Sequence, residues 1–189
     1  MVMKIAITGH KKGIGNEFAK QLSARGHTII GISRSDGENI RRVPHTASLV
    51  EPCDLFINNA QTGYYQTELL YEVWKRWKGE KKYIWNISSM MTESPVNLRP
   101  DGQDDILMSQ YHSQKITMDQ AARQLRHKSN WPMISTIKPG GVATQPNWSK
   151  DQKMDTDQWV RTVLDIFTNN DNLKITEITV GWIEKRIPI

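Results

Sequence analysis

The 189-residue sequence predicts a single domain of the α/β class, in which helices cover both faces of a parallel β-sheet. Short apolar runs rich in β-branched residues alternate with longer segments whose apolar residues recur every three or four positions. The first apolar run leads through a glycine-rich loop into such a segment, which is the order of a βαβ unit. This alternation is typical of a Rossmann-type doubly wound sheet.

The opening unit is predicted from residues 2–33. An apolar run at 2–8 predicts a strand, and helical spacing of apolar residues at 14–25 predicts a helix that ends before Gly26. A second β-branched run at 28–33 predicts a strand that lies in the same sheet.

The rest of the chain continues the alternation. Further strands are predicted at 54–58, 83–88, 133–138 and 175–182, and helices at 67–78, 109–128 and 155–168. Between 34 and 52 the pattern is weak, and we predict only a short edge strand at 43–47. Prolines and a glycine within 90–107 predict a loop that could cover a substrate.

The composition argues against several classes of protein. No apolar run reaches the roughly 20 residues that a membrane helix needs. The net charge of +5 is spread along the chain, without the basic runs or motifs of nucleic-acid-binding proteins. A single cysteine, Cys53, and five histidines without ligand-type spacing predict no disulfide and no metal site. No secretory signal pattern opens the sequence, so we expect a soluble, cytoplasmic protein.

The glycine-rich loop after the first strand has the features of a phosphate-binding turn. Gly9, Gly13 and Gly15 lie where the backbone must turn tightly and the start of a helix offers free N–H groups to an anion. An ordinary glycine-rich turn is the alternative, but the order strand, loop, helix favours dinucleotide binding. A Walker A loop is excluded, because Lys and Ser or Thr do not follow Gly13.

Tyr111 and Lys115 lie four residues apart in a predicted helix, which places both side chains on one face. A phenol is a poor acid or base at neutral pH, and a cation held beside it favours the phenolate. Singly, each residue could be an ordinary surface side chain. Together with Ser89 at the end of a predicted strand, the pair indicates general acid–base chemistry.

These segments resemble the short-chain dehydrogenase/reductase family, whose nucleotide loop is T-G-x-x-x-G-x-G and whose active site combines Ser with Tyr-x-x-x-Lys. The matching segments follow the family order: Thr8 to Gly15, Asn58-Asn59-Ala60, Asn86-Ile87-Ser88-Ser89, Tyr111 to Lys115, Pro139 to Thr144, and a terminal strand ending near Trp182.

The resemblance implies a role for each catalytic residue. Tyr111 would exchange the proton with the substrate oxygen, and Ser89 would orient that oxygen. Lys115 would hold the nicotinamide ribose and lower the pKa of Tyr111. Ser89 is preferred to Ser88, because the family serine usually closes an Asn-x-x-Ser pattern.

The resemblance also implies a cofactor site that extends over the loops between the predicted elements. Pro139 and Gly140 would lie beside the nicotinamide, and Thr144 would bind its carboxamide. A plain turn at the end of a strand is the alternative. The full set of implied cofactor-binding residues is Gly9, His10, Lys11, Lys12, Gly13, Ile14, Gly15, Ser33, Arg34, Asn59, Ala60, Tyr111, Lys115, Pro139, Gly140, Val142 and Thr144.

The choice of cofactor is predicted from the end of the second strand. An acidic residue there would bind the adenine ribose hydroxyls of NAD and repel a 2′-phosphate. Ser33 and Arg34 occupy the position instead, and Lys12 offers a second cation. Two solvated basic residues are the alternative, but the pattern resembles members that prefer NADP (NADPH).

Three departures from the family pattern stand out. The chain is shorter than most members, and Gln61 replaces a usual glycine after Ala60. The asparagine of the family's proton-relay tetrad has no counterpart in the sequence, and a replacement by Gln61 or Gln66 would be a guess.

Leu70, Val73, Trp74 and Trp77 give one predicted helix a broad apolar face. The face either packs in the core or forms a subunit interface, because the family commonly associates through this helix and the Tyr-bearing one. We expect a homodimer or homotetramer.

The sequence as a whole predicts an NADP(H)-dependent oxidoreductase that moves hydride between nicotinamide and a carbonyl or secondary alcohol substrate. An NADP-binding sensor, or a degenerate member without efficient turnover, is the alternative that the shortened segments suggest. An epimerase or dehydratase is disfavoured, because 189 residues leave no room for a larger substrate domain.

Overall fold

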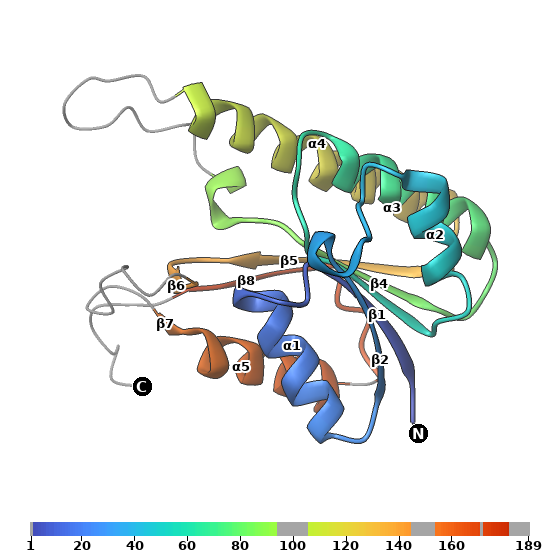
Figure 1. The fold of residues 1–189 in the computed structure, drawn as a ribbon, viewed down its shortest axis with the longest axis horizontal. Helices are drawn as coiled ribbons and strands as arrows, with labels where there is room; N and C mark the ends of the chain where they lie inside the picture. The colour runs from blue at the N-terminus through green and yellow to red at the C-terminus, as the bar shows by residue number, and fades with distance from the viewer. Residues whose placement is uncertain (1, 94–105, 145–153, 171, 182–189) are drawn as a thin grey trace.

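The computed structural model describes residues 2–93, 106–144, 154–170 and 172–181 (Figure 1). Its centre is a six-stranded, fully parallel sheet with the order β2-β1-β3-β4-β5-β8. The strands are β1 (Lys4–Thr8), β2 (Thr28–Ile32), β3 (Leu55–Asn58), β4 (Tyr83–Ile87), β5 (Met133–Pro139) and β8 (Glu177–Val180). Two further short strands, β6 (Val142–Ala143) and β7 (Met154–Asp155), pair with each other.

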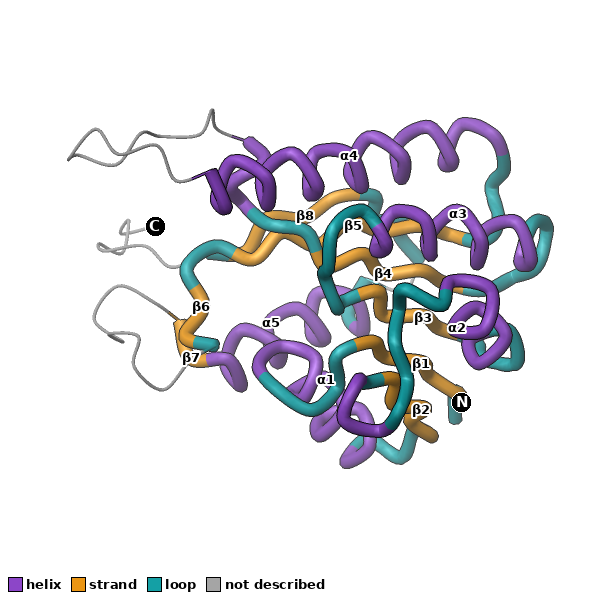
Figure 2. Tube along the Cα trace, turned by 45° about the horizontal axis from the view of Figure 1, so that its top comes forward, coloured by secondary structure: helices purple, strands orange, loops and turns teal. Residues whose placement is uncertain are grey.

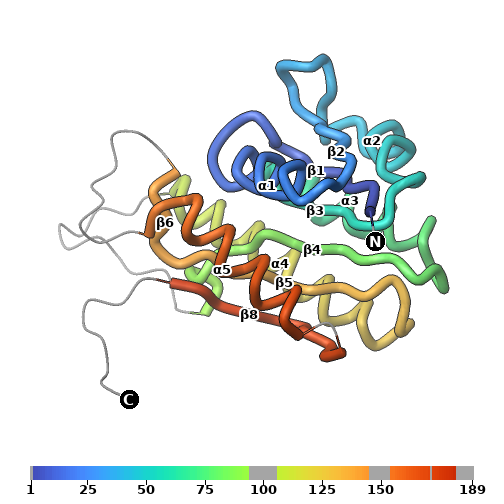
Figure 3. The backbone as a smooth tube through the Cα atoms, turned by 90° about the horizontal axis from the view of Figure 1, so that it is seen from below, coloured from blue at the N-terminus to red at the C-terminus, as the bar shows by residue number. Residues whose placement is uncertain are grey.

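Helices cover both faces of the sheet (Figures 1 and 3). On one face lie α1 (Gly13–Ala24) and α5 (Thr156–Thr168). On the other lie α2 (Val43–Val50), α3 (Tyr65–Trp77) and α4 (Ile106–Lys128). Each helical layer packs its apolar side on the sheet and forms one of two buried clusters. The predicted doubly wound α/β fold is therefore confirmed.

The strand order explains where a ligand can bind. The chain passes from β1 outward to β2 and then returns to β3 on the other side of β1. The two loops that leave β1 and β3 diverge at this switch point and open a crevice at the carboxyl edge of the sheet. Apart from Tyr111 and Lys115, which lie in α4, the predicted site segments follow strands at this edge, and Figure 2 shows the loops there.

The predicted edge strand at 43–47 is wrong, because this segment forms helix α2. Pro44 lies in the first turn, where its missing N–H removes no helical hydrogen bond. Thr46, Ala47 and Val50 are fully buried at helical spacing and pack this short helix against the core. The sheet therefore ends at β2.

Several other boundaries differ from the sequence prediction. Residues 90–93 of the predicted loop form a 3₁₀ turn, η2 (Met90–Glu93), and α4 begins at Ile106 rather than at 109. Strand β8 ends at Val180, and Trp182 lies outside the described residues. No helix among the described residues combines the length and the apolar content that crossing a bilayer requires.

The apolar face of α3 belongs to the core of the domain. Leu70, Val73 and Trp77 are at most 1% exposed, and Trp74 packs partly buried against the same cluster. The indole of Trp77 donates to the carbonyl of Glu51 at 3.1 Å. Core packing is therefore the correct interpretation and the subunit-interface interpretation of this face is wrong. The expected dimer or tetramer stays a prediction, which sedimentation can test.

Candidate active site

The loop after β1 has the geometry that its glycines predict. Gly9 has a φ of +72°, in the left-handed region that side chains with a Cβ rarely adopt. A Cβ at Gly15 would lie 2.5 Å from the carbonyl oxygen of Gly9 and 2.6 Å from Nδ2 of Asn59. Helix α1 begins at Gly13, so its first N–H groups lie at the crevice.

Hydrogen bonds join this loop to the end of β3. The hydroxyl of Thr8 accepts from the backbone N–H groups of Asn59 and Ala60, each at 2.9 Å. The side-chain amide of Asn59 donates to the carbonyl of Thr8 at 2.9 Å. Thr8 and Asn59 therefore hold together the two walls of the crevice, a structural role that the sequence analysis did not assign to them.

His10 faces the neighbouring strand rather than the crevice. A Cβ at Gly31 in β2 would lie 2.3–2.4 Å from the His10 ring, so this ring fits only against a glycine. Its Nε2 lies 3.3 Å from the Asp36 carboxylate, which also pairs with Lys11 at 3.1 Å. His10 therefore packs the loop against β2 and the 3₁₀ turn η1 (Arg34–Asp36).

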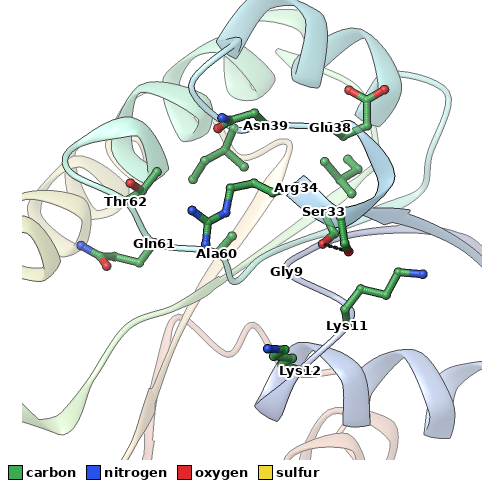
Figure 4. Close-up of a pocket in the computed structure, with 13 residues that line it drawn as sticks. Gly9, Lys11, Lys12, Ser33, Arg34, Glu38, Asn39, Ala60, Gln61 and Thr62 are labelled. Atoms are coloured by element: carbon green, nitrogen blue, oxygen red, sulfur yellow. Dashed lines mark hydrogen bonds between the residues drawn. The ribbon is translucent and has the colours of Figure 1, made fainter.

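A cavity of about 410 Å³ lies between the glycine loop and the end of β2. Figure 4 shows Arg34 directed across this cavity toward Ala60, with Lys11 and Lys12 on the loop beneath. The hydroxyls of Ser33 and Ser35 lie 3.0 Å apart. Glycine and basic residues thus surround a space that suits an anionic ligand.

Six of the predicted cofactor-binding residues line this cavity: Gly9, Lys11, Lys12, Ser33, Arg34 and Ala60. Further lining residues were not predicted: Ile32 at the end of β2, Ser35, Glu38, Asn39 and Ile40 after it, and Gln61 and Thr62 after β3. Glu38 puts an acid at the rim, but it pairs with His45 at 2.8 Å and lies 3.7 Å from Arg42.

A second cavity of about 550 Å³ contains the predicted catalytic residues. Ser89, Tyr111 and Lys115 line it together, although they come from the end of β4 and from α4. The other predicted cofactor residues in its wall are Ile14, Asn59, Pro139, Gly140, Val142 and Thr144. Gln61 lines both cavities, so the two spaces adjoin. Of the predicted cofactor residues, His10, Gly13 and Gly15 line neither cavity.

Lys115 is 3% exposed, and its ammonium is held by two acceptors. Nζ donates to the carbonyl of Ile87 at 2.7 Å and to Oε1 of Gln66 at 2.9 Å. It lies 5.6 Å from the centre of the Tyr111 ring. Burial lowers the pKa of Lys115 to about 7, because desolvation disfavours the ammonium, and the nearby Asp119 carboxylate opposes this shift.

The phenol of Tyr111 is also shifted by its surroundings. Burial raises its pKa, a hydrogen bond with Ser89 opposes the rise, and the Asp119 carboxylate adds to it. The ammonium of Lys115 is directed to Gln66 and Ile87, and its lowering of the Tyr111 pKa stays a prediction. The predicted preference for Ser89 agrees with its contact with the phenol.

Behind the catalytic residues lies a buried charge cluster that the sequence analysis missed. Asp119 is 4% exposed and follows Lys115 by one helical turn. Its Oδ2 accepts from the hydroxyl of Thr92 at 2.9 Å, and Lys138 of β5 lies 3.7 Å away. Burial raises the pKa of Asp119. The spacing of Tyr111, Lys115 and Asp119, each four residues apart, is the signal that could have identified it.

Comparisons with known proteins agree with the geometry. No protein-family model and no curated protein sequence matches the chain. Solved structures do match. A short-chain dehydrogenase from Burkholderia cenocepacia in complex with NADP has a TM-score of 0.73 at 17% identity, over 96% of this chain and 89% of that one. An alcohol dehydrogenase from Thermococcus sibiricus complexed with 5-hydroxy-NADP has a TM-score of 0.71 at 14% identity, over 100% of both chains.

A third solved structure is a 3-alpha-hydroxysteroid dehydrogenase from a Pseudomonas species complexed with NADH. It has a TM-score of 0.67 at 17% identity, over 94% of each chain. The chain therefore has the fold of the short-chain dehydrogenases over nearly its whole length. The resemblance predicted from the sequence motifs is confirmed at the level of the fold.

Proposed function

We propose that the chain is an NADP(H)-dependent oxidoreductase that interconverts a carbonyl compound and a secondary alcohol. The observation that carries this proposal is the meeting of Ser89, Tyr111 and Lys115 in one cavity that adjoins the basic cavity. Tyr111 provides the proton donor and acceptor, Ser89 a hydroxyl that orients the substrate oxygen, and Lys115 a cation. This is the set of groups that the resembling family uses. They lie where the fold binds dinucleotides.

The choice of NADP rests on charge. The crevice contains the glycine loop, in which a Cβ at Gly9 or Gly15 would collide with neighbouring atoms. Arg34 and Lys12 lie next to this loop. Among the described residues neither of these two cations forms an ion pair, whereas Lys11 pairs with Asp36. Arg34 and Lys12 are thus able to neutralise a 2′-phosphate. Of the solved structures named above, two hold NADP-type cofactors and one holds NADH, so the preference for NADP rests on Arg34 and Lys12.

The residues of the chain divide the reaction between them. When bound, the nicotinamide supplies or accepts the hydride. In reduction the phenol of Tyr111 gives its proton to the carbonyl oxygen, and in oxidation the phenolate takes the proton of the alcohol. Ser89 donates a hydrogen bond to the same oxygen and keeps it in line with the phenol. Lys115, buried beside the ring, would hold the nicotinamide ribose.

A mainly apolar substrate suits the wall of this cavity. Met90, Met91 and Met108 line it together with Ile14 and Val142. Flexible thioether side chains adapt to ligands of different shape. We infer that the substrate places its reacting oxygen at Ser89 and Tyr111 and an apolar body among the methionines.

The proposal is tested by adding NADPH with a panel of ketones, or NADP⁺ with a panel of secondary alcohols, to the purified protein and following the change in NADPH absorbance. Turnover of apolar members is the expected result. Tight NADPH binding without turnover of any carbonyl or alcohol would favour the sensor alternative. Failure to bind either dinucleotide would overturn both.

A further inference from the structure

Gln66 is a buried amide at the start of α3, and all of its polar atoms are used. It is 2% exposed. Its Nε2 donates to the carbonyl of Asn58 at 2.7 Å and to the carbonyl of Ile87 at 3.1 Å. Its Oε1 accepts from Nζ of Lys115 at 2.9 Å. One side chain thus links the ends of β3 and β4 to the catalytic helix α4.

The orientation of this amide is determined by its partners. The two carbonyl oxygens require the NH₂ group on their side, and the ammonium of Lys115 requires the oxygen on the other. Asn58 reinforces the arrangement, because its own side-chain amide donates to the backbone carbonyl of Gln66 at 3.0 Å. A rotated or shortened side chain at position 66 would leave buried polar groups unpaired, which is unfavourable.

The contact also determines how Lys115 is used. An ammonium has three donors. Two are directed to Gln66 and Ile87, so a single N–H remains for the cavity. Because Gln66 is neutral, it fixes the ammonium without the strong rise in pKa that a carboxylate would cause. Around Lys115, Tyr111 and Asp119 are the titratable neighbours on α4, while Lys138 of β5 faces Asp119.

We propose that Gln66 is the positioning residue of this active site: its amide oxygen holds Lys115 directly and aims the remaining N–H of Lys115 into the cavity. This inference rests on the proposed function for its catalytic consequence. In this chain a glutamine side chain contacts the lysine directly. The asparagine of the family's proton-relay tetrad has no counterpart in the sequence.

The test compares Gln66→Glu and Gln66→Leu with the unchanged chain. The first readout is the titration of Lys115, which is monitored by NMR through the Cε chemical shift in protein with labelled lysines. The Lys115 signal is assigned as the one that Lys115→Arg removes. Gln66→Glu should raise the pKa of Lys115, because a buried carboxylate favours the ammonium, and Gln66→Leu should lower it. The second readout is kcat/KM, which should fall by about 10- to 100-fold in Gln66→Leu, since misplacing a catalytic group by about 1 Å has such an effect.

Gln21→Leu is the matched control, because Gln21 lies in α1 on the other face of the sheet and its amide contacts Glu17 and Asp157. It should change neither readout. If Gln66→Leu does not fold, Gln66→Glu, which keeps the shape of the side chain, carries the test.

The outcomes separate the two proposals. An unchanged Lys115 titration in Gln66→Glu, with wild-type kcat/KM, would overturn the role of Gln66. Absence of turnover in the unchanged protein would overturn the proposed function, while the Lys115 titration would still decide whether Gln66 holds the ammonium.

Discussion

The ammonium of Lys138 lies 3.7 Å from the carboxylate of Asp119, and both side chains are at most 5% exposed. Lys138 also lies 3.3 Å from Glu93 and 3.5 Å from Glu177. The pair joins α4, which carries Tyr111, to β5, which leads into the predicted nicotinamide-binding segment. These buried charges therefore connect the elements on which the catalytic geometry depends.

Removing one partner of this pair should destabilise the protein. Asp119→Ala leaves Lys138 buried with only its two more exposed carboxylates. We expect the free energy of unfolding to fall by about 3 kcal/mol, the lower end for breaking a buried ion pair. Denaturant unfolding measures this. Asp157→Ala is the control, because Asp157 pairs with Arg161 at 3.7 Å with both side chains more than half exposed, and should change stability little. Equal stability of the two variants would contradict the prediction.

Gly31→Ala should disturb the glycine loop through His10. The added Cβ would lie 2.3–2.4 Å from the His10 ring, so the ring must move. We expect a loss of about 1–3 kcal/mol in the free energy of unfolding, as for overpacking elsewhere. In a His10→Ala background the same substitution should cost much less, and a double-mutant cycle in denaturant measures the difference. If the effects of the two substitutions on the free energy of unfolding were additive, the contact between positions 10 and 31 would not contribute to stability.

The features that the sequence alone predicted are those encoded by short, local spacing. The glycine loop and the pair Tyr111 and Lys115 depend on one turn or one helix, so a pattern is sufficient to identify them. The edge strand failed because the β-branched residues near Pro44 favour a strand, while burial at helical spacing produces a helix. Gln66 meets Lys115 only through the packing of α3 on α4, which no local pattern contains.

Cofactor preference should depend on Arg34 more than on Lys11. Arg34→Ala removes a charge-assisted hydrogen bond to the 2′-phosphate, worth about 1.5–3 kcal/mol, or roughly 10- to 150-fold in NADPH affinity. NADH affinity should change little. Lys11→Ala is the comparison, because Lys11 is paired with Asp36 and should affect the NADPH to NADH ratio less. Fluorescence titration of both dinucleotides measures the ratio. Equal loss for both cofactors in Arg34→Ala would indicate a structural arginine instead.

The two directions of the reaction should differ in their dependence on pH. Burial raises the pKa of Tyr111 above its ordinary value of 10, so the neutral phenol predominates at neutral pH. Reduction uses this phenol as its acid and should be insensitive to pH near neutrality. Oxidation requires the phenolate, so its kcat should rise with pH through the alkaline range. Ser89→Ala should move this rise to still higher pH, because the hydrogen bond from Ser89 lowers the pKa of Tyr111.

Tyr111→Phe removes only the hydroxyl and tests the same assignment directly. If the proton passes through this group, kcat should fall by about 10²- to 10⁴-fold in both directions, while NADPH affinity stays nearly unchanged. The alkaline rise of the oxidation rate should also disappear, which a merely structural role for the ring would not cause. Tyr71→Phe is the control, because Tyr71 is 43% exposed on α3 and should retain full activity. A Tyr111→Phe protein with wild-type turnover would mean that another group transfers the proton, and the buried Lys115, whose pKa of about 7 suits proton transfer near neutrality, would be the next candidate.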